Sequence, residues 1–336
     1  MDVFTNQPTT APTPEPTNVN EDNLLPQRCE ELWFEDGSVV IQAENTLFRV
    51  HSGVLAAQSE VFRDMFSLPP PADAETYDGC AFVRVSDSAE DMKHLLMVMI
   101  KCDFDNIVLN GSHGWEVLRL SSKYMVSHIR NHIISLLRVM LPMHMDDYHL
   151  VAKMDSVHFW FSPLRLRNTT LISAANIARE TNALKILPII LLQCCKWLTL
   201  QEILDGEKIC NKLLKLSPEN QRAVLLGREK LSIDVMTRVY SVLELTPRIS
   251  HACLDKDGCE AFRLVVMNRL YELGYTHKWI NPFCDFDEAF FCSDEELCKV
   301  CKVYYQQLFE NAQRKIWDKL PPYFDLPSWN NIHHQS

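Results

Sequence analysis

Cysteines crowd the stretch between residues 253 and 301, and their spacing is the feature of this sequence that could do chemistry. Cys298 and Cys301 form a C-x-x-C pair, and Cys253 and Cys259 are the pair that we expect to approach them. Four thiolates in a tetrahedron satisfy a structural zinc ion. Against this interpretation, the C-x5-C spacing of the second pair is unusual, and reduced cysteines also pack in helical cores. Two further cysteines compete for the same role: Cys284 and Cys292.

The residues around the C-x-x-C pair favour a structural metal over a catalytic one. Ser293 and Glu296 form a capping-box pattern that predicts a helix beginning just before Cys298. The oriented amides at such a helix start favour thiolates. Four thiolates leave no open coordination position, and the strand-loop-helix setting of a thioredoxin-like pair is missing from the pattern. We therefore expect a zinc ion at this place to brace the fold.

His51 invites a catalytic interpretation, because imidazole titrates near neutral pH and can act as a base. No nucleophile or acid-base partner accompanies it in its motif, so we interpret it as a hydrogen-bonded structural histidine. The sequence contains no G-x-S-x-G, no H-E-x-x-H, no phosphate loop and no dinucleotide fingerprint. We therefore expect a protein that is not an enzyme and requires no cofactor.

The charge balance disfavours two classes of partner. The chain has 33 basic and 44 acidic residues, and its net charge of -11 opposes both nucleic acid and anionic lipid. The N-terminus lacks the pattern of a secretory signal, and the apolar run Leu184 to Leu200 contains Lys185 and Lys196. We expect this run to form a buried helix in a cytoplasmic or nuclear protein with largely reduced cysteines.

Three regions follow one another along the chain. Residues 1–27 are rich in proline, threonine and acids, and we expect them to form a disordered tail. Residues 28–141 mix strand and helix patterns, which predicts one α/β unit. Residues 142–336 carry mainly helical periodicity, and almost no alternating runs occur there, which argues against a second sheet.

Within residues 28–141 the pattern is specific enough to predict individual strands and helices. The runs Val39 to Ile41 and Thr46 to Val50 predict a hairpin. The strand pattern Ala81 to Val85 precedes a helix that Ser88 would cap. The stretch from Trp115 to Met140 predicts two consecutive amphipathic helices that meet near Ser121 and Ser122.

Two neighbouring segments of this region carry a recognisable signature. Phe48, His51 and Leu55 fall in the pattern F-x-x-H-x-x-h-L, and Ser59, Phe62 and Phe66 fall in S-x-h-F-x-x-h-F, where h is hydrophobic. This signature resembles that of BTB/POZ domains. The resemblance covers about a third of the chain and implies an α+β fold, a small mixed sheet flanked by helices. It also implies homodimerisation or the binding of another protein, and no catalysis.

The sequence departs from better-known BTB/POZ domains at two places. Ser52 follows His51 where many members have a basic residue, so the pocket that contains Asp36 lacks its positive partner. Cullin-binding members often have a hydrophobic-x-Glu motif after the residue that matches Phe66, whereas three prolines follow here. These departures argue against corepressor-type recognition and weaken the role of a cullin ubiquitin-ligase adaptor. Transcriptional regulation through a partner stays open as a further alternative.

A narrower resemblance links the chain to BTB proteins that are abundant in mushroom-forming fungi. The run Leu32 to Gly37 and the strand around Ala81 to Val85 are similar to theirs. The C-x5-C pair, the C-x-x-C pair and the run Arg314 to Pro321 resemble the C-terminal half of the same proteins. This resemblance favours Cys253, Cys259, Cys298 and Cys301 as the ligands of a structural zinc ion over the alternative of reduced cysteines in a helical core.

Overall fold

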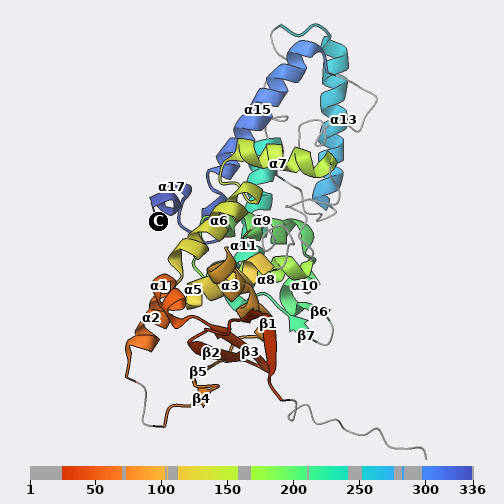
Figure 1. Cartoon of the computed structure of the whole chain (residues 1–336). Helices are drawn as coiled ribbons and strands as arrows, with labels where there is room; N and C mark the ends of the chain where they lie inside the picture. Colours follow the sequence, from red (N-terminus) through yellow and green to blue (C-terminus); the bar gives the residue numbers. More distant parts are fainter. Residues whose placement is uncertain are drawn as a thin grey trace, which may run out of the picture. The chain divides into compact units, whose positions relative to one another are not determined.

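The computed structural model describes residues 25–69, 73–102, 104, 113–157, 168–209, 212–240, 252–275, 282–283 and 297–334 (Figure 1). The chain divides into two compact units. The first comprises Met1–Ser52 and Pro69–Lys93, and the second comprises Gly53–Leu68 and His94–Ser336. The expected tail of residues 1–27 lies outside the described residues except for its last three.

The first unit is built on a mixed five-stranded sheet with the strand order β1-β3-β2-β5-β4. The strands β2 (Val39–Ala43) and β3 (Thr46–Val50) form an antiparallel hairpin, which confirms the prediction from their alternating runs. β5 (Cys80–Val85) pairs in parallel with β2, and the short β4 (Thr76–Tyr77) pairs antiparallel with β5. β1 (Gln27–Trp33) pairs in parallel with β3 at the opposite edge, and the sequence patterns did not predict this strand.

One face of the sheet carries a small hydrophobic core of its own. Side chains alternate between the two faces of a strand, so Val40 and Leu47 lie on the face opposite to Val39 and Phe48. Val40 and Leu47 are fully buried. Three partly buried aromatic residues cover this core: Trp33, Tyr77 and Phe82.

Contacts between the two edge strands close that face. The rings of Trp33 in β1 and Tyr77 in β4 meet edge to face at a centroid distance of 6.3 Å. The guanidinium of Arg28 lies 4.3 Å from the Trp33 ring centroid and donates to the Asp78 carboxylate over 2.8 Å. Because β1 and β4 are at opposite edges of the sheet, these contacts require the sheet to curl around its small core.

Helices dominate the rest of the chain. The hairpin is followed by α1 (Ser52–Gln58) and α2 (Glu60–Ser67), as the helical spacing of Leu55 and Phe62 predicted. The later helices are α3 (Ala89–Lys101), α5 (His113–Lys123), α6 (Ser127–Met140), α7 (Met145–Val157), α8 (Asn168–Glu180), α9 (Leu187–Trp197), α10 (Leu200–Asp205), α11 (Pro218–Val235), the π-helix η2 (Met236–Tyr240), α13 (Lys256–Tyr275), α15 (Lys299–Trp317), α16 (Leu320–Tyr323) and α17 (Trp329–His334).

The expectation that no second sheet would form is wrong. β6 (Glu207–Ile209) and β7 (Lys212–Leu214) pair antiparallel as a two-stranded hairpin between α10 and α11. Three residues per strand are too few for an alternating pattern to stand out from the sequence.

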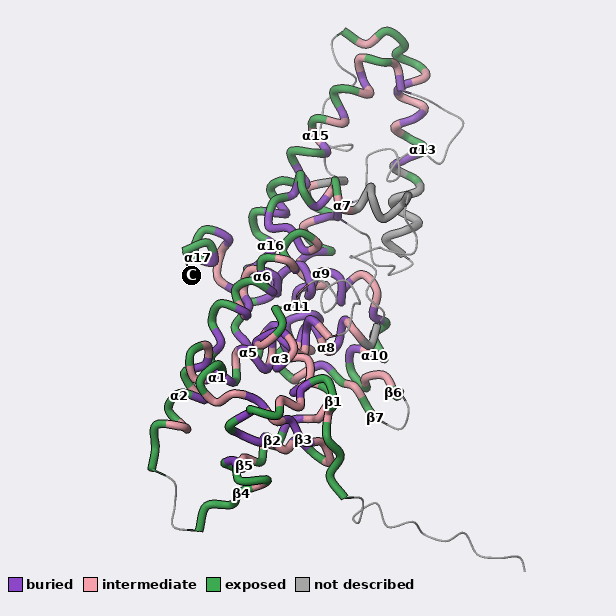
Figure 2. The backbone as a smooth tube through the Cα atoms, in the orientation of Figure 1, coloured by how far each residue is buried: buried purple, intermediate pink, exposed green. Residues whose placement is uncertain are grey.

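The second unit has its core around α9. Every residue from Leu187 to Cys195 is buried, and the helix packs against α8 and α11 (Figure 2). This confirms that the apolar run forms a buried helix. Within the described part of the chain, no helix has both the length and the apolar character needed to span a bilayer.

The break between α5 and α6 lies later than the sequence predicted. The hydroxyls of Ser121 and Ser122 both donate to the carbonyl of Leu118, so these serines stay inside α5. The chain turns at Met125, whose φ of 52° lies in the left-handed region. Methionine carries no sequence signal for this conformation, which glycine or asparagine would have given.

The C-terminal segment after α15 is fastened to the helical core by indole groups. Trp317 Nε1 donates to the Met143 carbonyl over 2.9 Å, and Trp329 Nε1 donates to the Trp317 carbonyl over 2.8 Å. The Phe324 ring lies against Gly227 in α11, at a place where a Cβ atom would come within 2.3 Å of the ring. Both tryptophans and Phe324 are buried, so this segment is an integral part of the core.

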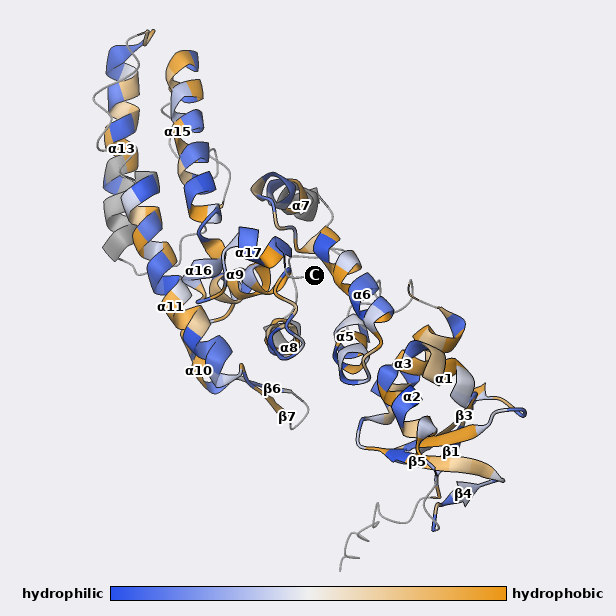
Figure 3. Cartoon of the chain, turned by 90° about the vertical axis from the view of Figure 1, so that its left-hand side faces the viewer, coloured by the Kyte–Doolittle hydropathy of each residue, from blue (hydrophilic) through white to orange (hydrophobic). Residues whose placement is uncertain are grey.

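The helices α13 and α15 run side by side from a shared end (Figures 1 and 3). Each mixes hydrophobic and hydrophilic residues along its length, as amphipathic helices do (Figure 3). Phe262 and Val266 of α13 are buried, as are Tyr305 and Phe309 of α15. The N-terminal ends of the two helices carry Cys259 and Cys298.

Candidate functional site

The histidine of the signature, His51, lies beside an acidic side chain and an aromatic ring. His51 Nε2 lies 3.2 Å from the Asp36 carboxylate, and the His51 ring is 5.5 Å from the Phe34 ring. The hydroxyl of Ser52, where many BTB/POZ domains have a base, hydrogen-bonds with that of Ser38 over 2.9 Å. Asp36 therefore faces His51 instead of a cation at position 52. Asp36 is exposed and His51 is partly exposed, so the pair contributes little to the stability of the fold.

The other signature residues are packing and capping groups. Phe48 in β3, Leu55 in α1 and Phe62 in α2 are fully buried. The Phe62 ring stacks on Phe66 at 5.9 Å and on Tyr124 at 4.9 Å. Offset stacking of this kind adds to the stabilisation from burial alone. The stacking of Phe62 on Tyr124 holds α2 against the segment that follows α5.

Ser59 makes two hydrogen bonds in a buried position. Its Oγ accepts from the Phe62 amide over 3.0 Å, which caps α2, and donates to the Tyr124 carbonyl over 2.6 Å. We expect Ser59→Ala to lower the free energy of unfolding by about 2 to 3 kcal/mol, because it removes the cap and leaves a buried carbonyl unpaired. The measurement is urea denaturation of the full chain.

Ser67→Ala is the matched control for Ser59→Ala. Ser67 ends the same helix and is exposed, and its Oγ donates to the Arg63 carbonyl over 2.7 Å. A surface change of this kind should shift the free energy of unfolding by less than about 0.5 kcal/mol. Equal denaturation midpoints for the two variants would contradict the assigned role of Ser59.

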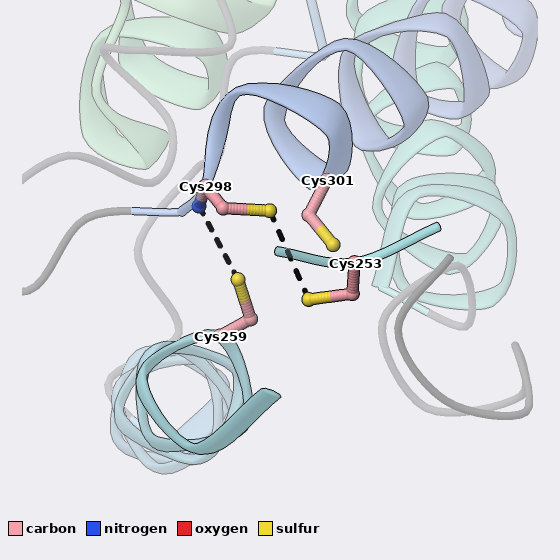
Figure 4. A group of neighbouring side chains, drawn as sticks. All are labelled: Cys253, Cys259, Cys298 and Cys301. Carbon is pink, nitrogen blue, oxygen red and sulfur yellow. Dashed lines mark hydrogen bonds between the residues drawn. The ribbon is translucent and has the colours of Figure 1, made fainter. Parts of the chain in front are cut away.

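The structure brings four cysteines together at the shared end of α13 and α15 (Figure 4). They are the four that the sequence indicated: Cys253, Cys259, Cys298 and Cys301. Their Sγ atoms all lie within 4.8 Å of one another, and Cys253 Sγ is 3.8 Å from Cys298 Sγ. The competing residues Cys284 and Cys292 lie outside the described residues.

Local structure explains how each sulfur reaches the cluster. Asp255 precedes α13 and its Oδ1 accepts from the Gly258 amide over 3.0 Å, which turns the chain between Cys253 and Cys259. Cys298 is the N-cap of α15, and Cys301 lies in the first turn. The predicted helix start at Ser293 and Glu296 falls outside the described residues. The structure begins α15 at Lys299, so Cys298 lies before the helix and not within it.

The thiols have unequal surroundings. The backbone amides of Cys301 and Leu254 lower the pKa of Cys298 to about 6, because their N–H groups stabilise the thiolate. Burial raises the pKa of Cys259 to about 11 and raises that of Cys301 further. The Cys298 amide also donates to Cys259 Sγ over 3.2 Å. Burial makes the negative charge of a thiolate costly. A bound metal ion would offset this cost with its positive charge and so favour all four thiolates.

The geometry of the cluster fits a tetrahedral zinc ion. A Zn–S bond of about 2.3 Å requires neighbouring sulfurs to lie about 3.8 Å apart in a regular tetrahedron. The separation of Cys253 Sγ and Cys298 Sγ is 3.8 Å, and the other sulfurs are close enough to complete the set. Backbone amides donate to the sulfurs of Cys298 and Cys259, and such hydrogen bonds orient and stabilise thiolate ligands around a metal. The residues therefore fit a structural Zn(Cys)4 centre.

Comparison with protein families decides the nature of the N-terminal region. A family described as the BTB/POZ domain matches residues 27–140. Residues 27–140 form a BTB/POZ domain. The BTB domain contains the five-stranded sheet and the helices α1, α2, α3, α5 and α6, and it is followed by a mostly helical C-terminal part. No curated protein matches the chain.

The BTB match separates the two sites. BTB domains are non-catalytic interaction modules, and all signature residues from Asp36 to Phe66 lie within the matched region. The four cysteines lie more than a hundred residues beyond its end. The BTB domain and the cysteine cluster are thus separate parts of the chain.

Proposed function

We propose that this chain is a non-enzymatic interaction protein whose BTB domain forms homodimers or recruits a protein partner. The BTB match at residues 27–140 carries the proposal. The buried signature residues support it, because they are committed to packing and capping and leave the surface of the domain for contacts with another protein. The net charge of -11 favours a protein partner over nucleic acid or an anionic membrane.

Light scattering coupled to size exclusion tests the homodimer. The chain has a mass of 38.9 kDa, so a dimer should elute with about twice that mass over a range of concentrations. A monomer at every concentration up to about 100 μM would contradict self-association. A pull-down with a cullin on the same preparation tests the adaptor role. If the chain is a cullin adaptor, the cullin should be retained together with it.

We further propose that Cys253, Cys259, Cys298 and Cys301 hold one structural zinc ion that braces the helical part. The convergence of four sulfurs at the N-terminal ends of α13 and α15 carries this proposal. The narrower resemblance to BTB proteins of mushroom-forming fungi includes both cysteine pairs and supports it. Elemental analysis of the purified full chain should find about one zinc ion per chain. A preparation that stays free of metal after incubation with Zn(II) under reducing conditions would contradict it.

A further inference from the structure

The four cysteines of the proposed metal centre are not equally accessible. Cys253 and Cys298 are partly exposed, whereas Cys259 and Cys301 are buried. The two accessible sulfurs belong to different segments of the chain, a loop before α13 and the N-cap of α15, yet they form the 3.8 Å contact of the cluster (Figure 4). The two more exposed sulfurs of the cluster are therefore also a close pair.

We propose that Cys253 and Cys298 are a redox modification site, at which a hydroperoxide converts the two thiolates into a disulfide and thereby expels the zinc ion. The inference rests on the proposed metal centre and adds its regulation. A disulfide needs an S–S distance of about 2.05 Å, so the two sulfurs have to approach by only about 1.8 Å. Cys259 and Cys301 lack this exposure, and the Cys298 amide already donates to the Cys259 sulfur.

The reaction proceeds in two balanced steps. One thiolate of the pair attacks an oxygen of hydrogen peroxide, the O–O bond breaks, and a sulfenic acid and one hydroxide form. The other thiolate then attacks the sulfenic sulfur, the S–S bond forms, and a second hydroxide leaves. The two sulfurs give up two electrons in total, which reduce the peroxide to two hydroxides that take protons from the buffer. Two thiolates are left for the metal, which is too few for a closed structural site.

The consequence for the fold is local. The metal joins the loop at Cys253 and the start of α13 to the start of α15, so its loss frees these two helix starts from each other. The helices retain their buried side chains further along, such as Phe262 and Phe309. Oxidation is therefore expected to loosen the shared end of α13 and α15 without unfolding the chain.

The test exposes the zinc-loaded full chain to an equimolar amount of hydrogen peroxide. Released zinc is followed with a metallochromic dye, and the disulfide is located by non-reducing peptide mapping. We expect zinc release together with a Cys253–Cys298 linked peptide whose mass is about 2 Da below that of the two free thiols. Thiol reductant and Zn(II) should restore the starting state.

A matched pair of ligand variants separates the redox role from metal binding. Cys253→His keeps four ligands but removes one member of the pair, so zinc release by peroxide should slow by at least about tenfold. Cys259→His keeps the accessible pair and should release zinc at about the rate of the unmodified chain. Equal rates for the two variants would overturn the proposal.

Peptide mapping of the unmodified chain shows which cysteines form the disulfide, even if a variant does not fold. A disulfide between Cys259 and Cys301, or zinc release without a disulfide, would overturn the assignment of the pair. A chain that contains no zinc would refute the metal centre alone. Mapping of the metal-free chain would then still decide whether Cys253 and Cys298 form the disulfide.

Discussion

Replacing Cys301 by serine is expected to reduce bound zinc from about one ion per chain to less than about a tenth. Cys301 is fully buried in the first turn of α15, and serine is a poor zinc ligand that leaves only three thiolates. Structural zinc contributes about 10 to 16 kcal/mol of apparent binding free energy in small zinc domains, so its loss releases the ends that it joins. Hydrogen exchange should speed up in the first turns of α13 and α15.

Cys194→Ala is the control for this experiment. Cys194 is as deeply buried as Cys301 but lies in α9, away from the cluster. This variant should keep its zinc and the exchange protection of α13, although its core is slightly less stable. If Cys301→Ser keeps a full complement of zinc, the cluster is not the metal site.

Replacing Gly227 by valine is expected to lower the free energy of unfolding by about 3 to 5 kcal/mol. A Cβ at this position would lie 2.3 Å and 2.4 Å from two carbons of the Phe324 ring, which is itself buried. The Phe324 ring has to leave its site on α11. Expelling it should lower the free energy of unfolding about as much as replacing a buried phenylalanine by alanine. Chemical denaturation of the full chain, followed by tryptophan fluorescence, measures the change.

Two further variants test the cause of this destabilisation. Gly53→Ala changes a helical glycine with no atom within 4 Å of the added Cβ, so it should be neutral or stabilise by up to about 1 kcal/mol. Gly227→Val combined with Phe324→Ala should cost clearly less than the sum of the two single changes, because both remove the same contact. Strict additivity would show that the valine acts through something other than the ring.

Much of the BTB domain could be predicted because its signals are local. The β2–β3 hairpin follows from alternating runs, and Leu55 and Phe62 recur at helical spacing with Ser59 between them. Each of these residues is buried or caps a helix. The sequence could not place α5 and α6 correctly, since their boundary depends on the left-handed backbone of Met125 and no glycine marks it.

Elements without local signals were missed. β1 carries Arg28, Glu30 and Glu31 on a strand whose residues are mostly exposed, so no alternation of apolar residues reveals it. Charged residues suit an edge strand because they discourage pairing with another chain. Its place in the sheet depends on distant partners, namely β3 and the ring of Tyr77. Pairing of this kind cannot be predicted from neighbouring residues.

The residues of the cysteine cluster could be predicted from the sequence, but their exposure could not. The C-x-x-C pair and its position at a helix start follow from spacing, and the structure brings the same four residues together. The choice of Cys253 and Cys259 over other cysteines depended on the turn at Asp255, whose carboxylate holds the Gly258 amide. The unequal exposure of the sulfurs could not be predicted, because it depends on how the two helices lie against each other.

The separation of the two cysteine pairs along the chain has a consequence for chain entropy. Cys253 and Cys298 are 45 positions apart, so a metal ion bound between them closes a long loop. The entropic cost of closing a flexible loop grows with the logarithm of its length, and doubling the length adds only about 0.6 kcal/mol. The entropic cost that the metal ion has to offset therefore depends only weakly on the number of residues between the two cysteine pairs.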